Sequence, residues 1–298
     1  MDQDYYRKSI GSRIFDFINI ILMLMVIFIM VYPFINQLAV SFNDSTDAVK
    51  GGIYFFPRKF STSAYKYIFE DVKLLKVTIM SVLRVIVGTI TCVFCTSLLA
   101  YVITIKWFSG RRFMRKLFVF TMYFGGGLIP FYLLMVRLHM TNSFNVYWIP
   151  GLLAPYYMLL IGAYMQDIPE AIFESARIDG ASELTVFFKI AMPMATPVIA
   201  AVCIFVAVGH WNSWFDCMIY NPSGQFDTLQ VYLKRLLLEV EAITGIRDQQ
   251  LLHSKYSELS PVTVRAAATV VVTAPIIIIY PFFQNFFIHG MRVGAVKE

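Results

Sequence analysis

Long runs of apolar residues constrain this chain more than any other feature. Residues 14–35, IFDFINIILMLMVIFIMVYPFI, contain one charged side chain, that of Asp16. A helix of about 20 such residues crosses the roughly 30 Å hydrocarbon core of a bilayer. The composition agrees, because 15% of the 298 residues are charged, whereas soluble domains carry about a quarter. We therefore expect an all-α membrane protein that crosses the bilayer several times.

Six apolar runs predict six transmembrane helices, and spans that pack on one another predict a single domain, residues 1–298. The predicted spans are 14–35, 77–105, 117–136, 146–165, 198–220 and 262–288. The third contains FGGGLIP, which indicates close helix packing or a local break. Two outer segments are substantial. Residues 36–76 are expected to be irregular, and residues 221–261 include TLQVYLKRLLLEVEAI, an amphipathic pattern typical of a helix on the outer face.

The positions of Lys and Arg predict the orientation of the chain. Short cytoplasmic loops carry an excess of these residues. The N-terminal tail is basic, and the loop after the second span is more so, which places both termini in the cytoplasm. The formal net charge of +6 has the same origin, because the bases cluster at the ends of spans, where they set the topology and meet lipid headgroups. No nucleic-acid partner is therefore expected. The five bases of that loop are Lys106, Arg111, Arg112, Arg115 and Lys116.

The chain lacks the motifs of several function classes. It has no G-x-x-x-x-G-K phosphate loop, no H-E-x-x-H and no G-x-S-x-G, which argues against an enzyme. Cys92 and Cys95 form a C-x-x-C within an apolar run, but no second ligand pair accompanies them. We therefore expect no metal site and no disulfide framework.

A polar segment, residues 167–197, separates the fourth and fifth spans. Asp167 is expected to cap a short helix, and Asp179-Gly180 to end it, because Gly tolerates the left-handed position after a helix. Ser182 is expected to cap a second helix, and Pro193 and Pro197 to kink the chain as it reaches the fifth span. The segment therefore predicts a helix, a sharp turn and a second helix that leads into the membrane.

The same segment resembles the EAA loop of ATP-binding-cassette (ABC) importer permeases. That pattern has the form E-A-A-x-x-D-G-A followed by F-x-x-I-x-x-P-x-x-x-P. Ser175 replaces the second letter of EAA, one small residue for another. The six spans, the long outer loop before the last span and the ending GMRVGAVKE resemble the carbohydrate-uptake class 1 branch of these permeases. The matching residues are Glu174, Ala176, Asp179, Gly180, Ala181, Phe188, Ile190, Pro193 and Pro197.

The resemblance implies the type I importer fold, in which the short helix is a cytoplasmic coupling helix that docks on an ATPase subunit. ATP and Mg²⁺ would then bind the ATPase subunits, and this chain would hold no cofactor. Closure of the ATPase subunits around ATP would rock the spans, since ATP would bind one arrangement better than the other. The expected coupling residues are Glu170, Glu174, Ala176, Arg177, Asp179, Gly180 and Ala181.

The resemblance also implies partners and a cargo. The partners are a second, homologous permease in a heterodimer, two ATPase subunits and an extracellular binding protein. In the fifth span, GHWNSWFD is similar to a subgroup that works with lipoprotein binding proteins and complex oligosaccharides. The expected location is the bacterial cytoplasmic membrane.

Several polar and aromatic residues within the spans are candidates for the substrate path. Aromatic rings stack on sugars while polar groups bind hydroxyls, and polar groups within a span usually face a cavity. The alternatives are an interfacial aromatic belt with a snorkelling acid, or ordinary packing. The candidates are Trp211, Asn212, Trp214, Asp216, Arg84 and Tyr156.

Two alternatives stay open. The first is a secondary transporter that works alone. Such a protein usually needs intramembrane acids, and the few ionisable groups of the predicted spans argue against proton coupling. They are Asp16, Arg84, His210 and Asp216. The second alternative keeps the permease fold and changes the cargo to a peptide, an amino acid or a metal complex.

Overall fold

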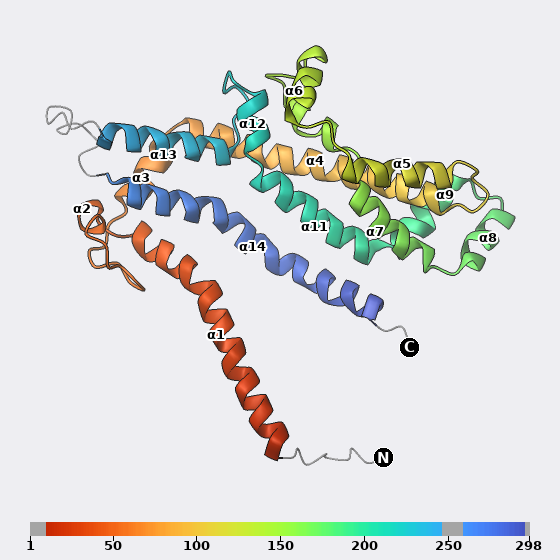
Figure 1. The fold of residues 1–298 in the computed structure, drawn as a ribbon, viewed down its shortest axis with the longest axis horizontal. Coiled ribbons are helices and arrows are strands. Elements are labelled where there is room, and N and C mark those ends of the chain that lie inside the picture. Colours follow the sequence, from red (N-terminus) through yellow and green to blue (C-terminus); the bar gives the residue numbers. More distant parts are fainter. Residues whose placement is uncertain (1–9, 246–258, 296–298) are drawn as a thin grey trace. The chain divides into compact units, whose positions relative to one another are not determined.

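Helices dominate the described part of the chain, residues 10–245 and 259–295 of a computed structural model (Figure 1). The prediction of an all-α fold is confirmed. The longer elements are α1 (Ile10–Ser41), α3 (Ser63–Glu70), α4 (Lys73–Thr104), α5 (Arg111–Tyr123), α6 (Leu128–Arg137), α7 (Pro155–Gln166), α8 (Glu170–Ile178), α11 (Thr196–Asn212), α13 (Leu229–Gly245) and α14 (Pro261–Ala295). The short ones are α2 (Ser45–Ala48), η1 (Phe144–Tyr147), η2 (Ile149–Gly151), α9 (Glu183–Val186), η3 (Phe187–Ala191), α10 (Met192–Met194) and α12 (Phe215–Tyr220).

The chain divides into two compact units. The first comprises residues 1–71 and 236–273, and the second comprises residues 72–235 and 274–298. The second unit contains the segment 167–197 and all the expected coupling and substrate-path residues. The expectation of a single transmembrane domain stays a prediction.

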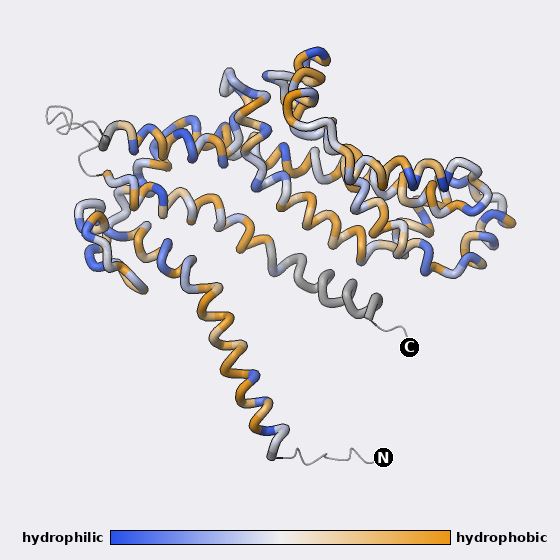
Figure 2. Tube along the Cα trace, in the orientation of Figure 1, coloured by the Kyte–Doolittle hydropathy of each residue, from blue (hydrophilic) through white to orange (hydrophobic). Residues whose placement is uncertain are grey.

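Apolar helices of membrane-spanning length account for the predicted spans. Within the described residues, three uninterrupted helices qualify: Gly11–Ser41, Lys73–Thr104 and Pro261–Ile279. Three bent pairs qualify together, and they raise the number of spans to six if each pair is one span. Figure 2 shows long hydrophobic stretches along α1, α4 and α11. The bent pairs are Arg111–Tyr123 with Leu128–Arg137 at 114°, Phe144–Gly151 with Pro155–Gln166 at 45°, and Glu183–Met194 with Thr196–Asn212 at 81°.

The third and fifth spans differ from straight helices. In the third, α5 ends before the glycines 125–127, and Gly127 has φ +81°, a left-handed value that favours glycine. The fifth is predicted as one span over 198–220, and a single helix there is wrong. Ser213 is extended with ψ 123°, so α11 ends at Asn212 and α12 begins at Phe215. The carboxylate of Asp216 accepts from Ser213 Oγ at 2.8 Å, a local bond that competes with helix continuation.

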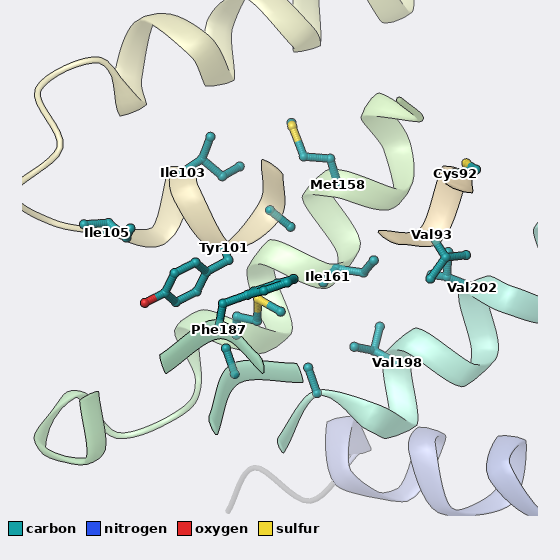
Figure 3. Close-up of a cluster of buried hydrophobic side chains, with 14 of the residues drawn as sticks. Cys92, Val93, Tyr101, Ile103, Ile105, Met158, Ile161, Phe187, Val198 and Val202 are labelled. Carbon is teal, nitrogen blue, oxygen red and sulfur yellow. The ribbon is translucent and has the colours of Figure 1, made fainter. Parts of the chain in front are cut away.

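The core of the second unit lies where α4 packs against α7 and α11. Figure 3 shows its side chains, among them Tyr101, Met158, Ile161, Phe187 and Val202, all buried. The helices α4 and α11 approach closely at Gly88, because a Cβ there would lie 2.4 Å from Nε2 of His210. Since α7 and α9 both join this core, the chain between them, which includes α8, is held at both ends.

The segment 36–76, which the sequence predicts to be an irregular outer loop, is more ordered than expected over its residues in the first unit. Two short helices, α2 and α3, interrupt it. Asn43 Oδ1 accepts from the backbone amides of Arg58 at 2.8 Å and Lys59 at 3.0 Å. The hydrogen bond from Asn43 and the nearby Arg58 hold the pKa of the Asp47 carboxyl below its usual range. The segment is therefore a fixed structure rather than an irregular loop.

Candidate functional site: an anchored polar helix and a buried ion pair

The helix α8 begins after a proline rather than after an acidic cap. Pro169 occupies the N-cap position, so the expectation that Asp167 is the N-cap residue of α8 is wrong. Asp167 instead follows α7 as its C-terminal cap. Glu170 is the acidic residue of the first turn, and its negative charge is favourable near the positive end of the helix dipole.

The end of α8 confirms the predicted stop at Asp179-Gly180. The amide of Gly180 donates to the carbonyl of Arg177 at 3.0 Å, and that of Ala181 donates to Ala176 at 3.0 Å. This pair of bonds is the Schellman arrangement, and it requires a left-handed residue, here Gly180 with φ +83°. Ser182 caps α9 as predicted, since its hydroxyl accepts from the amide of Thr185 at 3.3 Å. The turn between the two helices is therefore rigid.

One face of α8 is tied to the core of the second unit. Phe173, Ala176 and Ala181 are partly buried and pack against the core cluster. Arg177 Nε donates to Glu183 Oε1 at 2.8 Å, and the hydroxyl of Tyr101 donates to Glu183 Oε2 at 2.5 Å. The bond to Glu183 raises the pKa of Arg177 above its usual value. This network joins α8 to α9 and to the end of α4.

A second tie joins the start of α8 to the loop after α4. Lys106 forms an ion pair with Glu170. Beneath this pair lies an open cavity of about 340 Å³, which is also lined by Tyr101, Phe173 and Arg177. Two expected coupling residues, Glu170 and Arg177, are therefore engaged within the chain.

The opposite face of α8 is free to meet another molecule. Glu174, Ile178, Asp179 and Gly180 are exposed. Ile178 is an apolar side chain that is 85% exposed, in a position where the chain supplies no cover. The expected coupling residues thus fall into two groups. Glu174, Asp179 and Gly180 face outward, while Glu170, Ala176, Arg177 and Ala181 hold the helix in place.

The connection from α9 to the fifth span contains a wide turn. Residues Phe187–Ala191 form a π-helical turn, in which the amide of Met192 donates to the carbonyl of Phe187. The helical segment Glu183–Met194 then meets Thr196–Asn212 at 81°. The predicted kink at Pro193 and Pro197 is confirmed, and the wide turn before it has no proline of its own.

A second polar cluster lies among the apolar helices of the same unit. Arg84, on α4, has a side chain only 3% exposed and forms an ion pair with Asp216, on α12, at 3.1 Å between Nη1 and Oδ1. The guanidinium also lies over the ring of Tyr147, 4.7 Å from its centre. Tyr147 in turn donates to the carbonyl of Phe226 at 2.9 Å. The cluster joins four segments that are distant in the sequence.

The structure brings together only two of the six substrate-path candidates, Arg84 and Asp216. Trp211 lines a small apolar groove with Val85 and Pro275. Trp214 belongs to the break after α11, where Lys234 Nζ lies 3.6 Å from its ring centre. Asn212 and Tyr156 are exposed on α11 and α7. Whether any of them contacts cargo stays a prediction.

Sequence reasoning missed Tyr101, Tyr147 and Glu183, which hold these two regions together. Tyr101 and Tyr147 stand in segments without a motif, and Glu183 is not one of the motif positions, so the partner of each residue is visible only once the helices are packed. Glu183 offered one signal, because it stands six residues after Arg177 across a predicted tight turn. Tyr147 offered none beyond being an aromatic residue near the end of a span.

These features define a multi-pass membrane protein with a polar helix anchored outside its apolar core. No protein-family model matches the chain. A protein of Bacillus subtilis (strain 168), the polygalacturonan/rhamnogalacturonan transport system permease protein YtcP, is 33% identical over 287 residues, 96% of this chain and 99% of that protein. The chain therefore belongs to the family of ABC transporter permeases for sugar uptake, whose members are transport components.

Two solved structures share the fold. One is a bacterial ABC transporter involved in the import of the acidic polysaccharide alginate, with a TM-score of 0.84, 27% identity, and coverage of 94% of this chain and 99% of that chain. The other is a bacterial alginate ABC transporter in complex with an alginate pentasaccharide-bound periplasmic protein. It has a TM-score of 0.57 and 15% identity, and covers 92% of this chain and 94% of that chain.

Proposed function

We propose that this chain is the permease subunit of an ATP-driven importer that takes up an oligosaccharide. The family membership supports the transport role, and the polysaccharides named for YtcP and for the alginate transporter support a sugar cargo over the alternatives. The observation that carries the proposal is the division of α8 into an anchored face and an exposed face. A helix that only covered the core would leave acids such as Glu174 and Asp179 exposed, but it would not leave the apolar Ile178 exposed beside them.

In this proposal α8 transmits the motion of an ATPase subunit to the spans. Glu174 and Asp179 would pair with bases on the ATPase subunit, and Ile178 would fill an apolar groove there. Because Arg177, Glu183 and Tyr101 tie α8 to α9 and α4, a displacement of α8 would move those helices with it. ATP and Mg²⁺ would bind two ATPase subunits, and this chain would perform no chemistry.

The remaining partners follow from the same proposal. A second, homologous permease would complete the translocation path, and a lipoprotein binding protein would deliver cargo to the outer loops. The alginate transporter bound to a periplasmic protein supports the latter. The N- and C-termini and α8 would lie in the cytoplasm, and the loop of bases after α4 supports this orientation.

A charge reversal on the exposed face tests the coupling role. Glu174→Arg should reduce cargo-stimulated ATP hydrolysis of the assembled importer to its basal level while the chain still inserts in the membrane. Glu239→Arg is the matched control, since Glu239 is equally an exposed acid but belongs to α13. Stimulation that survives Glu174→Arg, or that is lost equally in the control, would reject docking at α8.

A double substitution tests the substrate path. Trp211→Ala combined with Asn212→Ala should lower sugar uptake more than basal ATP hydrolysis if these side chains contact cargo. An equal loss of both activities would assign the two residues to packing. Tyr156→Ala, on the exposed side of α7, provides a second candidate for the same comparison.

A further inference from the structure

We propose that the start of α5 forms a binding site for the phosphate of an anionic lipid headgroup. The site is a groove of about 250 Å³ between the end of α4 and the first turns of α5. The groove is lined by four cationic side chains and by no carboxylate. Its polar lining consists of Lys106, Arg111, Arg112, Arg115, Thr104 and Gln166.

Three of the four cations of the groove, all except Lys106, lack balancing charge within the described residues. Within the described residues, no ion pair or side-chain hydrogen bond involves Arg111, Arg112 or Arg115. Like charges around one groove repel, and an anion between them removes the repulsion. Arginine suits this role because its planar guanidinium binds two phosphate oxygens at once.

The helix itself favours an anion at the same place. The first turn of α5 has no acidic residue and no side-chain cap, and it begins with Arg111 and Arg112. Positive side chains at the positive end of a helix dipole are unfavourable, and the unpaired amides there attract anions. A phosphate in the groove would offset both effects. The groove and the helix start therefore indicate the same ligand.

The surroundings point to a lipid as the source of the phosphate. Phe113, Leu117 and Phe120 are three or four residues apart on α5 and exposed, so an apolar face lies beside the basic one. The start of α5 also begins the bent pair that forms the third predicted span, so its bases lie where that span meets the lipid headgroups. Trp107, next to Lys106, is 66% exposed, and tryptophan is enriched at headgroup level.

The site shares a residue with the anchor of α8. Lys106 lines the groove and also forms the ion pair with Glu170. A headgroup in the groove would compete with Glu170 for this ammonium group. If the proposed coupling function holds, the lipid would thereby adjust how firmly the start of α8 is held. Lipid binding itself does not depend on that function.

The test measures lipid binding by the full chain. Native mass spectrometry from nanodiscs of phosphatidylcholine, with and without phosphatidylglycerol, gives the apparent Kd of phosphatidylglycerol. Arg112→Gln with Arg115→Gln should raise it by roughly fivefold for each arginine removed. Lys116→Gln, on the same helix but outside the groove, should leave it unchanged. An unchanged affinity for phosphatidylcholine confirms that the variants are folded.

Three results would overturn the proposal. An equal loss in the Lys116→Gln control would assign the effect to surface charge rather than to the groove. Binding of inorganic phosphate in phosphatidylcholine discs, with the same arginine dependence, would make free phosphate the ligand. Loss of ATPase copurification in the arginine variants, without any change in lipid binding, would assign the groove to an acidic protein surface.

Discussion

The two polar regions of the second unit use ion pairs in opposite ways. At α8, the pairs Arg177–Glu183 and Lys106–Glu170 join helices while neighbouring acids remain exposed. At the other region, the guanidinium of Arg84 is buried and its charge is matched by Asp216 from the same chain. A charge among apolar spans must be neutralised from within, because hydrocarbon offers no water. On a helix such as α8, water can solvate the unpaired acids, so these acids remain available to bind a partner.

The largest effect is expected from breaking the buried pair on one side. Asp216→Leu leaves Arg84 buried without a partner and should destabilise the chain by about 3–5 kcal/mol. Arg84→Met should cost less, since the side chain of Asp216 is 27% exposed and that of Arg84 only 3%. Thermal unfolding in detergent measures both.

The double variant, Arg84→Met with Asp216→Leu, sharpens this comparison. It removes both charges and should recover most of the stability lost in Asp216→Leu. Equal unfolding temperatures for the two single variants would contradict the unequal burial. A double variant as unstable as Asp216→Leu would show that shape, rather than charge balance, governs this region.

A smaller effect is expected at the anchor of α8. Tyr101→Phe removes the hydroxyl that donates to Glu183, and it should cost about 1–2 kcal/mol, because Arg177 still neutralises the carboxylate. Hydrogen exchange should quicken in α8 and stay unchanged in the middle of α4. Faster exchange throughout α4 would show that the substitution disturbs the core instead.

The next loss of stability is expected from substitutions of Gly180, in the turn between α8 and α9. Gly180→Ala should cost about 1 kcal/mol, since an L-residue disfavours the left-handed conformation. A Cβ there would meet no atom within 4 Å, so the penalty comes from the backbone alone. Gly180→Asn should cost less, because asparagine tolerates this conformation. Equal melting temperatures for the two variants would contradict this account.

The smallest effect is expected where a charge sits on an aromatic ring. Lys234→Met removes the ammonium group above Trp214, and it should cost about 0.5–1 kcal/mol because the site is open to water. Lys189→Met, on the exposed side of the wide turn, serves as the control. A loss as large as that of Asp216→Leu would place Trp214 inside the buried cluster.

Features that depend on local chemistry could be predicted from the sequence. Span length follows from hydropathy, and the stop at Gly180 and the cap at Ser182 follow from the backbone preferences of those residues. The helix division at Ser213 could not be predicted, because it depends on Asp216 being drawn to Arg84, which lies 132 residues away. Asp167 failed as a cap because it directly follows the last residue of α7, and α8 begins only at Glu170, after Pro169.

In the candidate site, too, the sequence could not predict features that depend on how distant helices pack. The motif identified which residues belong to α8, but it did not separate Glu174, which is exposed, from Arg177, which is paired with Glu183. That division depends on which face the core covers, and the position of the core depends on α4 and α7. Similarly, a helical wheel could not place Trp214 relative to Trp211 once the helix between them ended.

The π-helical turn Phe187–Ala191 fixes the direction in which α8 faces. Such a turn contains one residue more than an α-helical turn, and each residue of an α-helix adds a rotation of about 100°. Removing one residue from this turn would restore ordinary pitch and rotate α9 and α8 by that angle about the axis of the helical segment Glu183–Met194. Glu174 would then point away from its present direction. A single additional amino acid therefore determines the direction in which the exposed face of α8 points.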